Sequence, residues 1–182
     1  TEHTSGAMPD AKDFSAESAL LSDTHGLIFL ARVTDNVARP GHGENMWKGD
    51  SIQIRFDRNA LRYASATGSD LEVGFSVDES GKVHNWCWDA GQDPFAGKEL
   101  SAGLVQSHGI RMPGSYFLAA RLSWKLLGDL RHNKRFGFSI VINDSDSPSH
   151  RAVYFLTPGV HDAKYSNQYV QALLDTGTPV FW

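Results

Sequence analysis

The stretch that decides the fold is Trp47-Lys48-Gly49-Asp50-Ser51-Ile52-Gln53-Ile54-Arg55-Phe56-Asp57. From Ser51 onward, apolar and polar residues alternate, and this period of two is typical of a half-buried β-strand. The apolar members are expected to face a core, whereas Gln53, Arg55 and Asp57 are expected to face the other way. The Gly49-Asp50 pair predicts a turn that holds Trp47 exposed at the start of the strand.

An exposed indole beside a row of outward polar side chains has the chemistry of sugar recognition. The indole face stacks on the C–H face of a pyranose ring, and amide and charged groups form hydrogen bonds with its hydroxyls. Trp47 and Gln53 are therefore the first candidate sugar-binding residues. A structural interpretation stays open, because Trp47 could also cover the open end of the domain.

Seven further short segments have the alternating or apolar character of strands, and Gly, Pro, Asn and Asp separate them. Regularly spaced short strands predict an all-β fold, a two-sheet antiparallel β-sandwich of the jelly-roll kind. One helical turn is expected near residues 123–128, because Ser123 can cap it and Gly128 can end it, and Trp124 is expected in the core. The predicted strands are 27–34, 71–77, 83–88, 115–122, 136–143, 151–156 and 168–174.

The composition limits the classes of protein to which the chain can belong. With 182 residues, 41% of them hydrophobic, residues 11–182 are expected to form a single domain with its own core. Residues 1–10 carry no pattern and are expected to be a disordered end or an expression remnant. A formal net charge of -4 argues against a nucleic-acid partner, and no apolar run has the length of a membrane span. Cys87 is the only cysteine, which excludes an intrachain disulfide and zinc sites built on several thiolates.

Four pieces of the sequence together carry a resemblance to a known family. In order they are Leu27…Val33-Thr34-Asp35, the segment from Met46 to Ile54, Leu122-Ser123-Trp124-Lys125-Leu126-Leu127, and the segment from Gly137 to Asp144. Their order and spacing, from roughly Ser15 to Leu174, resemble the family nine carbohydrate-binding modules. The resemblance implies a β-sandwich of two antiparallel sheets, structural calcium, and a non-catalytic role in binding polysaccharide or oligosaccharide. It also implies attachment to a polysaccharide-active enzyme and a secreted or cell-surface location, although no signal peptide opens the sequence.

The resemblance transfers unevenly to single residues. Trp47 stands where the family places one of two tryptophans that sandwich a terminal sugar ring, and Gln53 stands where a polar residue is expected. Gly74 stands where sugar-binding members carry a basic residue, and the second tryptophan is missing. Tyr165 is the nearest aromatic residue in the matching segment, so we expect it opposite Trp47 across a cleft. Gln53 and Lys164 would point into that cleft.

Trp86 and Trp88 form a second aromatic pair on one predicted strand. The strand period places both indoles on one face and Asn85 and Cys87 on the other. Facing away from the opposing sheet, the two indoles would form a second platform for sugar rings. Facing that sheet they would be core, and the burial tendency of tryptophan favours this second interpretation.

The sequence Asn143-Asp144-Ser145-Asp146-Ser147 concentrates oxygen ligands in what reads as one turn. An Asp-x-Asp spacing suits a hard cation, so Asp144 and Asp146 are candidate calcium ligands. Turns are also rich in Asp and Ser for backbone reasons alone. Further candidates from other loops are Asp35, Asn36, Glu44 and Asp50.

Three other functions compete with sugar binding. A sandwich that has lost its ligand could serve as a spacer or docking domain beside a catalytic domain. A haem protein of the same broad fold could use Met46 or Met112 with a histidine as axial ligands. A glycosidase would need two opposed carboxylates, for which Glu17, Glu44, Glu72, Glu79 and Asp89 are available. Since the sequence also lacks a Gly-x-Ser-x-Gly elbow, we expect a binding module and not an enzyme.

Overall fold

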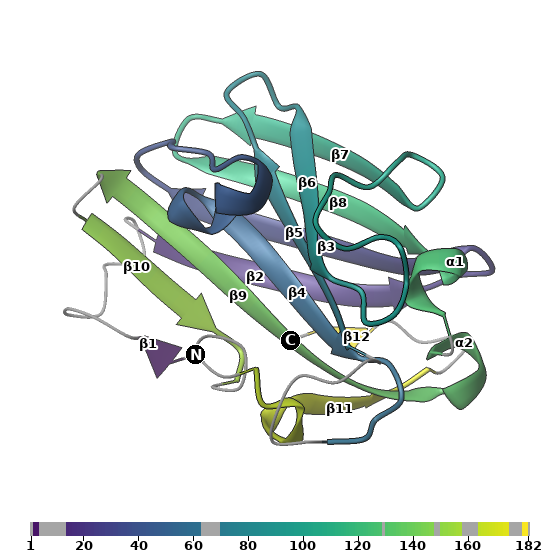
Figure 1. Cartoon of the computed structure of the whole chain (residues 1–182). Helices are drawn as coiled ribbons and strands as arrows, with labels where there is room; N and C mark the ends of the chain where they lie inside the picture. Colours follow the sequence, from purple (N-terminus) through teal and green to yellow (C-terminus); the bar gives the residue numbers. More distant parts are fainter. Residues whose placement is uncertain are drawn as a thin grey trace.

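The structure is a computed structural model that describes residues 2–3, 14–62, 70–128, 130–147, 150–157, 164–174 and 180–181. Two antiparallel sheets pack face to face (Figure 1), which confirms the predicted β-sandwich. The seven-stranded sheet contains β1 (Glu2–His3), β10 (His150–Phe155), β9 (Arg135–Ser147), β4 (Ser51–Asp57), β5 (Asp70–Val77) and β6 (Val83–Asp89) in that order, with β11 (Val170–Leu173) also paired to β9. The five-stranded sheet has the order β12 (Val180–Phe181), β2 (Phe14–Ser22), β3 (Gly26–Asp35), β8 (Ser115–Ser123) and β7 (Val105–Met112).

The core lies between the sheets and follows the alternation of the strands. Ile52, Ile54 and Phe56 of β4 have no exposed surface, as their spacing predicts. From the other sheet, Phe29 and Val33 of β3 meet them in the same cluster. Burial of each such side chain contributes about 1.5–3 kcal/mol to stability, so this alternation determines which face of each sheet points outward.

Short helices connect the strands. The 3-10 helix η1 (Gly43–Lys48) precedes β4, and the 3-10 helix η3 (Ser166–Gln168) precedes β11. The expected helical turn is α1 (Trp124–Leu127), where the Ser123 hydroxyl accepts a hydrogen bond from the amide of Leu126 at 3.3 Å. Gly128 ends it with φ +58°, a conformation that suits glycine. No helix in the part of the chain that the structure describes is long and apolar enough to cross a membrane.

Several elements differ from the sequence-based expectations, among them β12 and η1, which were not predicted. β2 was not predicted, because its sequence FSAESALLS is rich in Ala, Leu, Glu and Ser, which favour helices or caps. β7 was not predicted either, since it is an edge strand with mostly polar, exposed residues. The helix α2 (Leu130–Asn133) was missed. β1 lies within the segment 1–10, which carries no sequence pattern, and pairs there with β10.

The outer face of the seven-stranded sheet is the surface that faces away from the other sheet. The strand register arranges its side chains in rows. One row joins Gln53 of β4, Gly74 of β5 and Trp86 of β6, and the next row joins Arg55, Glu72 and Asp89. We call the first the tryptophan row and the second the charged row.

Candidate functional site

Trp47 is carried by η1, which lies across the outer face at the start of β4 and is drawn in dark blue in Figure 1. Two close backbone approaches shape this segment. A Cβ atom on Gly41 would lie 1.9 Å from the carbonyl oxygen of Met46, and one on Gly49 would lie 2.4 Å from that of Arg39. The Trp47 side chain is therefore presented by a tightly folded turn, and the residue is 38% exposed. The ammonium of Lys48 lies 5.3 Å from the centre of the Trp47 ring.

Gln53 lies in the tryptophan row and is half-buried. Its Oε1 atom accepts a hydrogen bond from Nδ2 of Asn143 at 3.5 Å, and the same nitrogen donates to the Ser51 hydroxyl at 3.1 Å. The contact with Asn143 orients the Gln53 amide. Amide donors held in this way can recognise sugar hydroxyls.

Trp86 and Trp88 are both half-buried on the outer face, whereas Asn85 and Cys87 point into the sandwich and are buried. The interpretation of the tryptophans as core is therefore wrong. The inward positions suit the smaller residues, because Asn85 bonds the backbone of Leu100 and Cys87 belongs to the core cluster. Burial raises the pKa of the Cys87 thiol to about 12.

The Trp88 ring covers Gly74. A Cβ atom on Gly74 would lie 2.4 Å from Cζ3 and 2.5 Å from Cη2 of Trp88. The indole Nε1 of Trp88 donates to the carbonyl oxygen of Glu44 in η1 at 2.9 Å. In this chain an indole thus fills the position from which the basic residue expected of the family would project.

Arg55 and Glu72 of the charged row are buried and Asp89 is half-buried, which the alternation pattern did not predict. The guanidinium of Arg55, which has no exposed surface, contacts Glu72 at 2.5 Å, Asp89 at 2.9 Å and Asp70 at 3.1 Å. Burial opposes its charge, yet these carboxylates raise the pKa of Arg55 above its ordinary value. Because one arginine satisfies several acids, this row is a structural ion cluster.

Lys164 and Tyr165 adjoin the charged row. The ammonium of Lys164 contacts Glu72 at 2.5 Å, and Tyr165 is 39% exposed at the start of η3. The structure thus brings η1, Gln53, Trp86 and Trp88 together around Gly74. It places the Lys164 ammonium on Glu72, one row further along the sheet.

An acidic cluster lies at one end of the sandwich, where β3 and β9 come together. Carboxylate oxygens of Asp35, Asp144 and Asp146 all lie within 4.8 Å of one another. The expected turn at Asp144 and Asp146 is corrected here, because β9 continues to Ser147 and pairs Asp144 with Ala152. In the sequence, Asp35 is only one of several loop candidates, since a contact between different sheets has no signal in sequence spacing.

Hydrogen bonds and charge tie Asp50 to this cluster. Asp50 Oδ1 accepts from the amide of Ser145 at 2.9 Å, and Arg111 donates to Asp35 at 3.2 Å. Burial raises the pKa of Asp50 to about 7 and raises that of Asp35 as well. Among the described residues, acidic groups here outnumber the cations that contact them, and a set of carboxylate oxygens matches the donors that calcium prefers. The residues therefore fit a calcium ion.

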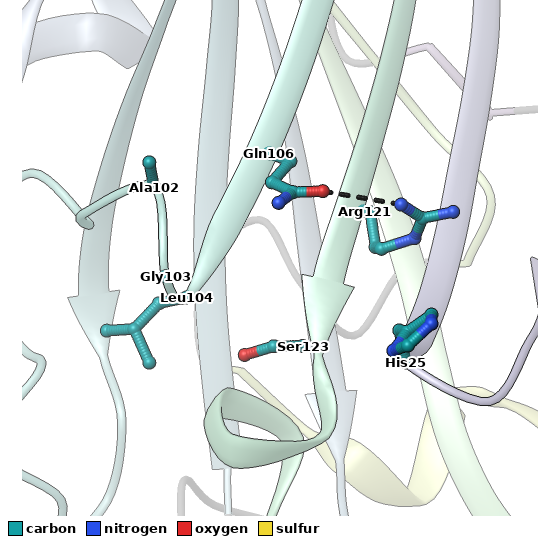
Figure 2. A pocket seen from close by; sticks show the side chains of 7 residues that line it. All are labelled: His25, Ala102, Gly103, Leu104, Gln106, Arg121 and Ser123. Atoms are coloured by element: carbon teal, nitrogen blue, oxygen red, sulfur yellow. Dashed lines mark hydrogen bonds between the residues drawn. The ribbon is translucent and has the colours of Figure 1, made fainter.

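Two cavities in the described part of the chain lie away from the tryptophan row. One, of about 390 Å³, is lined by residues including His25, Gln106 and Arg121 on the five-stranded sheet (Figure 2). Its arginine already bonds Gln106 at 3.3 Å and Asp23 at 2.8 Å. The other, of about 380 Å³, is lined partly by Asp35 and Arg111 and so borders the acidic cluster.

The residues invoked for other functions have different neighbours. Met46 of η1 is buried against the seven-stranded sheet, whereas Met112 is 40% exposed on β7 of the other sheet. The structure does not bring these two methionines together. Glu72 and Asp89, candidate glycosidase carboxylates, both bind the same guanidinium.

Comparisons with known proteins agree with this architecture. Residues 1–171 match the family profile described as carbohydrate family 9 binding domain-like. A family 9 carbohydrate binding module from Caldicellulosiruptor kristjanssonii in complex with cellotriose has a TM-score of 0.70 at 19% identity, over 97% of this chain and 80% of that one. The family 9 module from the same organism in complex with glucose also has a TM-score of 0.70 at 19% identity, over 97% of this chain and 82% of that one. A protein from Bacteroides uniformis ATCC 8492, named as a candidate carbohydrate-binding protein, has a TM-score of 0.52 at 9% identity, over 87% and 77% of the two chains. A search of the curated proteins found no significant match.

Proposed function

Because the chain belongs to the carbohydrate family 9 binding domain-like family, we propose that it binds a neutral mono- or oligosaccharide without transforming it. The bound sugar would lie on the outer face beside η1. Trp47 would supply a stacking surface, and the amide of Gln53 would bond the sugar hydroxyls. The similar modules in complex with glucose and cellotriose make these two sugars the first ligands to test.

The observation that carries this proposal is an exposed indole on a helix that packs against β4, the strand that carries Gln53 as a half-buried amide on its outer face. Trp47 keeps 38% exposure although its helix is anchored to the sheet. Gln53 lies in the same row as Gly74, over which the Trp88 ring packs. Trp86 extends the same row by a further aromatic surface. Affinity per module is expected to be weak, since sugar hydroxyls exchange water for protein hydrogen bonds of similar strength.

Calcium belongs to the same proposal as a structural ion. Asp35, Asp144 and Asp146 would hold it between the ends of β3 and β9. The ion would neutralise carboxylates that are otherwise buried at a cost, and it would join the two sheets at this end. Asp50, which bonds the amide of Ser145, would orient the segment that carries two of the ligands.

A rival function is a docking or spacer domain that has lost its sugar site. Two observations favour it. Trp88 fills the space over Gly74, and the ammonium of Lys164 is committed to Glu72. The first puts a neutral indole where the family resemblance implies a basic group, and the second pairs the Lys164 ammonium with a carboxylate. Attachment to a polysaccharide-active enzyme and a secreted location are compatible with either function and remain part of the proposal.

The proposal is tested by calorimetric titration of the protein with glucose, cellotriose and a panel of soluble polysaccharides. Binding of at least one neutral sugar, with no release of new reducing ends during incubation, is the expected result. Absence of heat with every sugar, in protein supplied with calcium, would favour the docking domain. Release of reducing ends would make the chain an enzyme.

A further inference from the structure

Trp88 supports η1 from below, and η1 carries Trp47. Three contacts join η1 and the residue before it to the sheet. The Trp88 Nε1 atom donates to the carbonyl oxygen of Glu44, Met46 packs above Gly74, and His42 meets His84 edge to face with ring centres 4.6 Å apart. Two of these contacts involve side chains of β6, and the third involves the glycine that Trp88 covers.

A β-bulge in β6 lies at Trp88, which strand alternation already places on the outer face, and it brings Asp89 onto that face as well. Cys87 pairs with Val73 and Asp89 pairs with Glu72, so Trp88 is the extra residue between them. Bulges bend a strand and re-aim side chains near binding sites. Here the bulge lets Asp89 reach Arg55 at 2.9 Å while the Trp88 ring covers the neighbouring row.

We propose that Trp88 is a positioning residue, which fixes η1 and thereby the orientation of the Trp47 indole, and that Gly74 is required because it leaves room for the Trp88 ring. This inference rests on the proposed sugar-binding function of Trp47. It assigns Trp88 a role different from that of a stacking platform.

The physical argument starts from the size of η1. It has six residues, and 3-10 helices of this length have poor hydrogen-bond geometry and little stability of their own. An exposed ring on such a turn would sample several orientations, and fixing it would cost binding free energy. The indole donor and the covered glycine hold the turn before the ligand arrives. The site is thus pre-organised by a contact that the ligand need not touch.

Two substitutions break this support in different ways. Gly74→Ala places a methyl group 2.4 Å from the Trp88 ring and displaces it. Trp88→Phe keeps an aromatic ring and removes the donor to Glu44. Gly103→Ala is the matched glycine control, because the nearest atom to its Cβ would be 4.0 Å away. Trp124→Phe is the matched donor control, because it removes an indole bond to the carbonyl oxygen of Asp23 at the other end of the domain.

The readout is fluorine NMR of protein labelled with 5-fluorotryptophan, with the Trp47 signal assigned by Trp47→Phe. In the absence of sugar, Gly74→Ala and Trp88→Phe are expected to shift or broaden the Trp47 signal, and both controls to leave it in place. In titrations with cellotriose, the two variants are expected to bind the sugar at least about tenfold more weakly than the wild type does. If Gly74→Ala does not fold, Trp88→Phe alone decides.

An unchanged Trp47 signal in folded Gly74→Ala or Trp88→Phe protein overturns the proposal. If, in addition, the variants bind sugar more weakly and sugar shifts the Trp88 signal of the wild type, Trp88 contacts the sugar directly and is not a positioning residue. If the wild type binds neither glucose nor cellotriose, the proposed function fails for these sugars. The sugar-free spectra still decide whether Trp88 positions Trp47.

Discussion

Single residues of this chain divide into those that offer surface to a ligand and those that hold the fold. Trp47 and Phe117 are alike in exposure, at 38% and 37%, and each ring has a cation above it at 5.3 and 5.6 Å. Trp47 lies on η1, which packs on the seven-stranded sheet, whereas Phe117 lies on β8 of the five-stranded sheet. Substitution of each ring in turn therefore separates the loss of a sugar-binding ring from the loss of any exposed aromatic ring.

Trp47→Ala is therefore expected to weaken sugar binding by about 2 kcal/mol, roughly thirtyfold, as is typical of a central aromatic contact. The free energy of unfolding should change by less than about 1 kcal/mol, because the ring contributes little to the core. Phe117→Ala should leave sugar affinity unchanged. Calorimetric titration with cellotriose and thermal melts measure the two effects, and a large loss of stability in Trp47→Ala would make the residue structural.

Arg55→Met tests the buried ion cluster. The substitution leaves Asp70 and Glu72 buried without their arginine, so we expect a loss of about 3–5 kcal/mol in the free energy of unfolding. Arg32→Met, at an exposed arginine over Phe117, should cost less than about 1 kcal/mol. Chemical denaturation measures both variants. Equal, small effects would show that solvent reaches the cluster.

At the scale of elements, chain reversals depend on local hydrogen bonds and on glycine. The α1 turn is short, so its cap is a large part of its stability. The hydroxyl of Ser123 caps the amide of Leu126, while Leu126 and Leu127 of the same turn have no exposed surface. Loss of the cap therefore weakens a packed part of the core.

Ser123→Ala should lower the free energy of unfolding by about 1 kcal/mol, the usual cost of losing a helix cap. Ser107→Ala, at an exposed position of β7, should change it by less than about 0.5 kcal/mol. Denaturant midpoints with unchanged slopes give this comparison. Identical midpoints for Ser123→Ala and the wild type would contradict the assigned cap.

At the scale of the whole molecule, the acidic cluster joins the ends of the two sheets. Removal of calcium with a chelator is expected to lower the melting temperature, and added calcium should restore it, because the ion binds the folded state preferentially. Calcium at a hundredfold excess over its dissociation constant contributes about 2.7 kcal/mol, or roughly 5–10 °C in a domain of this size. The variant Asp144→Asn should lose the response. A melting temperature unaffected by chelator would remove calcium from the proposal.

The pH dependence of the calcium-free protein follows from Asp50. Its pKa is raised from 3.8 to about 7 in the folded state by burial, so the folded state holds this proton more tightly than the unfolded state. The resulting stability is complete below the unfolded pKa and is lost as the pH rises through the folded one. Melting temperatures of dialysed protein should therefore fall between pH 4 and 7 for the wild type more than for Asp50→Asn. Parallel pH profiles for the two proteins would contradict this role of Asp50.

Much of the sandwich could be predicted from the sequence by local rules. Alternation located β4 from Ser51 to Asp57, and the flanking Ser and Gly residues located α1. Strand period also paired Trp86 with Trp88 on one face and Asn85 with Cys87 on the other. These features depend on neighbours in sequence, because backbone geometry alone sets a period of two and the ends of a helix.

Contacts between distant segments were decided only by the tertiary structure. The sequence could not tell which face of β6 points outward, because a register shift by one residue exchanges the two faces. Nor could it reveal the bulge that brings Asp89 to Arg55, the burial of Arg55 among three carboxylates, or the approach of Asp35 to Asp144. By itself the sequence determined that two sheets form and that Trp47 stays at a strand's start. The packing of those sheets decided which polar groups are buried, since burial depends on what covers a side chain and not on its own neighbours in the chain.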